Sequence, residues 1–175
     1  YTVLGASGKK RNLLTSLTEV GIEPYRFEYY YDTQKGFPNY STFGIDHWSF
    51  WNGQTQTSTM MPIGTYDSNH DYTFAVNNVR EPNFNYSLQG MLKKITYPTK
   101  GYTEFIYEPH SYTKRLESKS VNGFLPKLYN VNGICGGTRI KKISDFDGVN
   151  LPIEKNYTYN NGILLKWPRY TFYFK

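Results

Sequence analysis

Residues 90–108 read Gly-Met-Leu-Lys-Lys-Ile-Thr-Tyr-Pro-Thr-Lys-Gly-Tyr-Thr-Glu-Phe-Ile-Tyr-Glu, and this stretch decides the fold class. A short apolar segment comes first, a turn containing Pro98 and Gly101 follows, and the second segment then carries aromatic residues at alternate positions. Such segments around a Gly/Pro turn are typical of a β-hairpin, and the alternation places the aromatic rings on one face of a strand. The stretch therefore predicts a hairpin over residues 92–107.

The same pattern occurs twice more in the chain. Residues 140–159 contain Ile-Lys-Lys-Ile, then Asp-Phe-Asp-Gly, then Tyr-Thr-Tyr, and residues 14–29 give a looser version around Gly21. An internal repeat of this kind indicates that one supersecondary unit recurs. We therefore expect three hairpins, with their alternating aromatic residues on buried or inter-sheet faces: Phe27, Tyr29, Phe105, Tyr107, Tyr157 and Tyr159.

The composition favours the same fold class. The 175 residues include 18 Tyr and 11 Phe but only two Ala, and aromatic residues favour strands whereas Ala is the best helix former. We expect an all-β, antiparallel, hairpin-rich fold with at most one short helix over residues 82–89, which Gly90 ends. Residues 117–132 read as a polar interruption between strands. No composition shift divides residues 1–175, so they are expected to form a single module.

Charge and motifs exclude several functional classes. The net charge of +6 comes from basic residues that stand among acidic neighbours, so nucleic acid is not an expected partner. No apolar run is long enough for a membrane span. The single Cys135 has no local base, and no catalytic motif is present. Residues 67–71 resemble the start of a calcium loop, but its Gly and distant Glu are missing, so we expect no metal and no cofactor.

Four segments resemble the Rhs/YD-repeat proteins of Bacteroidetes in order and spacing. They are residues 90–108, Leu14–Leu17 with Pro24–Tyr29, Asp46–Trp48 with Trp51–Gly53, and Gly136–Ile143. The resemblance implies a piece of a long secreted or surface protein, at or before the entry to hairpin repeats that wind into a shell. It implies a non-catalytic structural module, with neighbouring repeats of the parent chain as partners. An exposed edge or apolar patch is expected near residues 170–175.

The repeats depart from the regular family pattern. They are irregularly spaced, and the Tyr-Asp dipeptides at Tyr31-Asp32 and Tyr66-Asp67 fall outside the hairpins. We therefore expect a sheet-rich globular module related to the shell, not a regular turn of its spiral.

The aromatic segment at residues 46–53 allows two interpretations. In an exposed groove, Trp rings stack on sugar faces while Asp and Asn hold hydroxyl groups, which would make a carbohydrate-binding module. Alternatively, the Trp rings plug the core and pin a long loop, with the polar residues hydrogen-bonded around them. The candidate carbohydrate-binding residues are Asp46, His47, Trp48, Trp51 and Asn52.

Overall fold

The computed structural model describes residues 1–5, 7–54, 64–66, 72–74, 80–118 and 125–166. The fold is mostly antiparallel β-sheet, which confirms the all-β prediction. The sequence-ordered elements are β1 (Thr2–Leu4), β2 (Arg11–Leu13), β3 (Ser16–Leu17), β4 (Tyr25–Tyr29), β5 (Gly64–Tyr66), β6 (Tyr72–Phe74), α1 (Phe84–Ser87), β7 (Leu92–Thr96), β8 (Tyr102–Ser118), β9 (Pro126–Phe146), β10 (Ile153–Asn156) and β11 (Ile163–Leu164).

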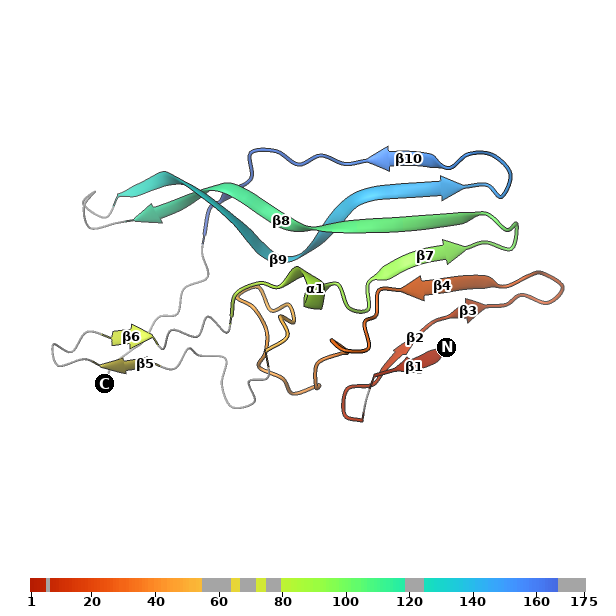
Figure 1. Ribbon diagram of the computed structural model, residues 1–175, viewed down its shortest axis with the longest axis horizontal. Helices are drawn as coiled ribbons and strands as arrows, with labels where there is room; N and C mark the ends of the chain where they lie inside the picture. Colours follow the sequence, from red (N-terminus) through yellow and green to blue (C-terminus); the bar gives the residue numbers. More distant parts are fainter. Residues whose placement is uncertain (6, 55–63, 67–71, 75–79, 119–124, 167–175) are drawn as a thin grey trace.

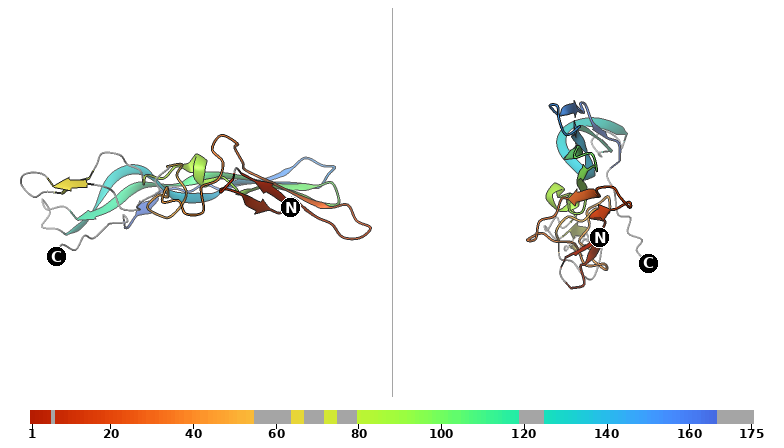
Figure 2. Two further views of the ribbon diagram at one scale, coloured as in Figure 1. Left: turned by 90° about the horizontal axis from the view of Figure 1, so that it is seen from below. Right: turned by 90° about the vertical axis from the view of Figure 1, so that its right-hand side faces the viewer.

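One seven-stranded sheet dominates the molecule, in the order β10-β9-β8-β7-β4-β3 with β11 pairing β8. β8 and β9 are much longer than the other strands and run the length of the sheet (Figure 1). Seen edge-on, the sheet is long and thin (Figure 2). The separate β1–β2 and β5–β6 pairs are antiparallel.

The three predicted hairpins are present in this sheet. β3 pairs with β4, β7 with β8, and β9 with β10, each in antiparallel register. In the turn between β7 and β8, the N–H of Tyr97 donates to the carbonyl of Gly101, and Lys100 adopts a φ of 68°. The short helix is also confirmed, since α1 is one turn whose N-cap Asn83 accepts from the N–H of Asn85.

The predicted polar interruption at residues 117–132 is wrong for the part that the structure describes. Glu117 and Ser118 end β8, and residues 126–132 begin β9, so these two strands form a fourth and longer hairpin. The polar residues were misleading because this end of the β8–β9 ladder is largely exposed, and an exposed strand needs no alternating apolar face.

The aromatic positions are only partly as predicted. Phe27, Tyr29, Phe105 and Tyr107 are half-buried, but Tyr157 and Tyr159 lie beyond the end of β10 and are each 41% exposed. The prediction was wrong for these two because their strand ends at Asn156. The Tyr159 hydroxyl instead donates to the Ile140 carbonyl at 2.8 Å, beside the Arg139 guanidinium over its ring.

The buried core is small. The buried apolar residues of the described part are Phe37, Tyr112 and Leu164. Nearly all strand residues whose burial the structure describes are half-buried or exposed, and the buried ones are Tyr112, Gly137, Ser144 and Leu164. Much of the sheet surface is therefore not covered by this chain. Among the described helices, none is long and apolar enough to cross a membrane.

Candidate functional site

The Asp46-containing segment forms a tight loop that its own carboxylate organises. Ile45 and Trp51 form an antiparallel bridge, and the N–H of Asp46 donates to the Phe50 carbonyl at 2.7 Å. Inside this loop Asp46 Oδ1 accepts the N–H groups of Trp48 and Phe50 at 2.8 and 2.9 Å. A carboxylate that accepts backbone N–H groups in this way fixes a turn that would otherwise leave them unpaired.

Residues just before α1 hold the loop from outside. Arg80 is buried, and its guanidinium donates to the Asp46 carbonyl at 2.7 Å. The N–H of His47 donates to the Arg80 carbonyl at 3.2 Å, and the Asn52 side chain donates to the Glu81 carbonyl at 3.0 Å. These bonds join the loop to a segment far along the chain, as expected of polar groups buried beneath aromatic residues.

Two glycines of β9 allow this loop to sit directly on the sheet. A Cβ at Gly136 would collide with the Asp46 carboxylate, and a Cβ at Gly137 would approach the Phe50 ring at 2.9 Å. Gly137 also has a φ of 87°, which L-residues rarely adopt. The Gly136-Gly137 pair therefore sets the place on β9 where the loop packs.

Burial sets the charge state of the groups around the loop. It raises the pKa of Asp46, against a smaller lowering by two backbone N–H donors and Arg80. Burial also lowers the pKa of His47, so its imidazole is neutral near pH 7. The pKa of the Cys135 thiol is raised by burial, which leaves the thiol protonated and poorly nucleophilic.

The five predicted carbohydrate-binding residues do not form one exposed surface. Asp46 is 0% exposed and Asn52 is 3% exposed, and both serve to hold the loop. His47, Trp48 and Trp51 are half-buried, and the His47 and Trp48 rings meet edge to face. This arrangement favours the loop-pinning interpretation for Asp46 and Asn52. Sugar binding through all five residues stays a prediction.

A groove lies beside Trp51, and we call it the aromatic groove. It consists of two adjoining pockets of about 410 and 400 Å³, which share Pro38, Trp51 and Tyr86 as a common wall. The Trp51 and Tyr86 rings meet edge to face at 4.9 Å. Gly53 permits this contact because a Cβ there would collide with the Tyr86 ring.

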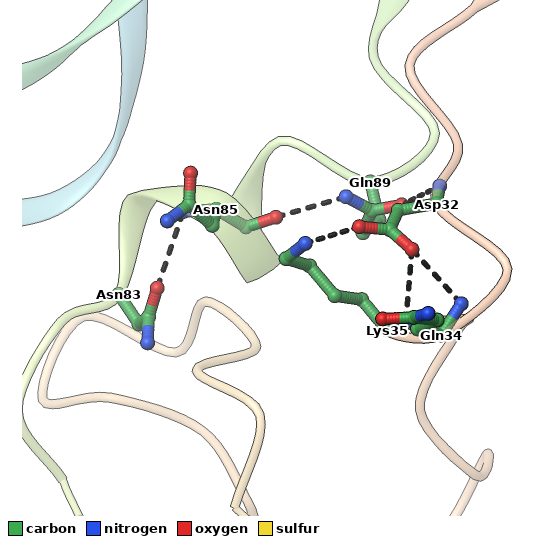
Figure 3. Close-up of polar contacts among 6 residues, drawn as sticks. All are labelled: Asp32, Gln34, Lys35, Asn83, Asn85 and Gln89. Atoms are coloured by element: carbon green, nitrogen blue, oxygen red, sulfur yellow. Dashed lines mark hydrogen bonds and ion pairs between the residues drawn. The ribbon is translucent and has the colours of Figure 1, made fainter.

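Polar contacts fix the wall of the groove that α1 provides (Figure 3). The Gln89 side chain accepts the N–H of Asp32 at 2.7 Å and donates to the Asn85 carbonyl at 2.9 Å. Asp32 in turn accepts the N–H of Gln34 at 2.9 Å and pairs with the Lys35 ammonium. The Lys35 hydrogen bond is the main cause of the lowered pKa of Asp32. Gln89 therefore links α1 to the turn that carries Gln34 and Lys35.

Sequence reasoning missed Arg80, Tyr86 and Gly136 as parts of this region. Arg80 and Tyr86 carry no local motif, and only their hydrogen bonds and ring contacts across long separations reveal them. The Gly136-Gly137 dipeptide was a visible signal, since paired glycines inside a strand indicate close approach of another segment. The positions considered for calcium, residues 67–71, lie outside the described residues, as do residues 170–175, where an exposed edge or apolar patch was expected.

Comparison of the chain with protein-family models, with curated proteins and with solved structures finds no match.

Proposed function

We propose that this chain is a non-catalytic structural module of a large secreted or surface protein of the Rhs/YD-repeat type, in which it contributes to a β-hairpin shell. The observation that carries the proposal is the uncovered sheet: among the strand residues whose burial the structure describes, only Tyr112, Gly137, Ser144 and Leu164 are buried. A sheet that buries so little of itself gains stability when neighbouring repeats cover it.

The edge strand β10 supports the same proposal. No strand of the described residues pairs with its outer edge, and all four of its residues are exposed. The segment that leads into it exposes Val149 and Leu151, and β10 itself begins with the exposed Ile153. An unpaired edge with apolar neighbours is a template for another strand. Glu154 forms an ion pair with Lys142, and Lys155 forms one with Asp145, so both side chains turn back towards β9. The outer backbone edge of β10 is therefore left open.

The test compares amide hydrogen exchange in this chain alone and in a longer natural chain that contains it. We expect the β10 amides to exchange quickly in the isolated chain and to become protected when the neighbouring repeats are present. Amides of the inner strand β8 serve as the internal reference, because they are paired in both. Equal and fast exchange of β10 in both chains would contradict the proposal, as would hydrolysis of a glycan or peptide at enzyme-like rates.

A further inference from the structure

The aromatic groove combines ring surfaces with cations and amides. Arg11 lines one of its pockets, and Lys9 and Lys35 line the other. Amide side chains accompany them in both pockets, and neither set of lining residues includes an acid. The amides are Asn12, Gln34, Asn39, Gln54 and Gln89.

Arg11 is held in place before any ligand arrives. Its guanidinium donates to the carbonyls of Lys10 and Pro38 at 3.0 and 3.1 Å, and it lies 4.1 Å from the centre of the Tyr40 ring. A guanidinium positioned in this way loses little side-chain entropy when an anion binds. Lys35 is also positioned, because its ammonium pairs with Asp32, while Lys9 is exposed.

These features select one class of ligand. Aromatic rings present apolar surface to the C–H faces of sugars, and amides exchange hydrogen bonds with hydroxyl groups. Lys35 is already paired with Asp32, so Arg11 in one pocket and Lys9 in the other are the cations that favour a ligand with a negative charge in each pocket. Each pocket falls within the roughly 300–1,000 Å³ range of small-molecule sites, and the two adjoin at one aromatic wall.

We propose that the aromatic groove binds an acidic oligosaccharide, with sugar rings against Trp51 and Tyr86. One carboxylate or sulfate group pairs with Arg11, and the next pairs with Lys9. This site differs from the five residues predicted from sequence, of which it retains only Trp51. It does not rest on the shell proposal, since a structural module and an enzyme could each carry such a groove.

The test measures binding by isothermal titration calorimetry with four probes. They are a galacturonic acid tetrasaccharide, a sulfated glycosaminoglycan tetrasaccharide, a neutral galactose tetrasaccharide and oligothymidylate. We expect at least one acidic sugar to bind at least tenfold more tightly than the neutral one, and to weaken as salt is raised. The two acidic probes separate carboxylate from sulfate recognition.

Three variants locate the site. Lys9→Gln is expected to weaken binding about two- to fivefold, as for an exposed ion pair. Arg11→Gln is expected to weaken it at least about tenfold, since a charge-assisted hydrogen bond is lost. Lys141→Gln, an exposed charge-matched change on β9 outside the groove, is expected to leave binding unchanged. If Arg11→Gln lowers the melting temperature, the Lys9 and Lys141 variants still decide the result.

Several results would overturn the proposal. These are no binding of either acidic probe up to about 1 mM, equal binding of the neutral sugar, or equal losses for Lys9→Gln and Lys141→Gln. Tighter binding of oligothymidylate would assign the groove to single-stranded nucleic acid instead.

Discussion

The carboxylate of Asp46 occupies the space in which any residue other than glycine at position 136 would place its Cβ. The Asp46 Cγ lies 2.9 Å from that position, and the Asp46 Oδ2 lies closer still. Asp46 is fully buried, and its Oδ2 has no hydrogen-bond partner among the described residues. The fit between these two residues therefore joins the aromatic loop to the sheet by shape, while Oδ1 supplies the hydrogen bonds inside the loop.

Gly136→Ala is expected to lower the free energy of unfolding by about 1–3 kcal/mol, because the added methyl group overpacks the contact with Asp46. In the double variant with Asp46→Ala, the new methyl group has room, so the two losses should not add. A coupling energy of about 1 kcal/mol or more in urea unfolding is expected. Asn132→Ala, an exposed change on the same strand, serves as the control, and strictly additive losses would contradict this account.

Asp46→Asn tests the charge of the buried carboxylate. The folded chain raises the pKa of Asp46, so it holds the proton more tightly than the unfolded chain does. The stability that this group contributes is present below its ordinary pKa near 4 and is lost as pH rises through the raised value. Asn retains an oxygen for the two N–H donors but does not titrate. The stability of Asp46→Asn relative to the unsubstituted chain should therefore increase with pH in paired urea titrations.

A constant difference between the two proteins from about pH 4 to 8 would show that Asp46 keeps an ordinary pKa when folded. Asp46→Ala supplies the comparison, because it removes the Oδ1 acceptor as well. It should be less stable than Asp46→Asn by about 1–3 kcal/mol at every pH.

Trp51→Ala is expected to lower the free energy of unfolding by about 3 kcal/mol, the lower end for loss of a large aromatic ring, because Trp51 is only half-buried. Trp51→Phe keeps a ring against Tyr86 and should cost clearly less. Thermal unfolding of both variants is the measurement. A melting temperature unchanged by Trp51→Ala would show that the ring does not pin the loop.

Asp147, at the β9–β10 turn, is expected to titrate with a pKa of about 2. The Asn150 side chain donates to it at 2.6 Å, and the N–H groups of Val149 and Asn150 add two more bonds at 2.8 Å. Because the pKa is lowered, the stabilising contribution is present above the ordinary carboxyl value and is lost as pH falls through about 2. The measurement is carboxyl-carbon NMR against pH.

Asn150→Ala removes the largest of these contributions, so it should raise the pKa of Asp147 towards its ordinary value. The pKa of Asp145, which Thr103 and Lys155 lower, should stay where it is. A shift of both residues together would point to a general change in the turn.

The hairpins were predictable because their determinants are local. Turn residues such as Gly101 and alternating side chains on either side of them specify register without reference to the rest of the chain. The full length of the β8–β9 ladder was not predictable in this way, since Lys127, Asn130 and Asn132 interrupt the apolar residues of this largely exposed segment. Tyr157 and Tyr159 continue the alternation, yet the strand ends before them, so the pattern alone overstated their burial.

The candidate site was harder to predict because its partners are distant in sequence. The segment around Trp51 stands out by composition, but whether its rings are buried depends on Arg80, Tyr86 and Gly136. The aromatic groove also needs Arg11, which the sequence presents only as one member of a basic cluster. Contacts of this kind are set by packing, which leaves no local pattern.

The pairing of β4 with β7 has a kinetic consequence. The strands from β7 to β10 follow one another through successive antiparallel connections, whereas β4 must close the whole segment from Tyr30 to Met91 before it gains its register with β7. Closing a long loop costs conformational entropy before any stabilising contact forms, so pairings between residues distant in sequence form late. The β7–β10 meander is therefore expected to assemble first, with β4 and the aromatic loop added afterwards. Pulse-labelled hydrogen exchange during refolding would show this as earlier protection of Ile95 than of Tyr30, whose N–H donates to the Met91 carbonyl.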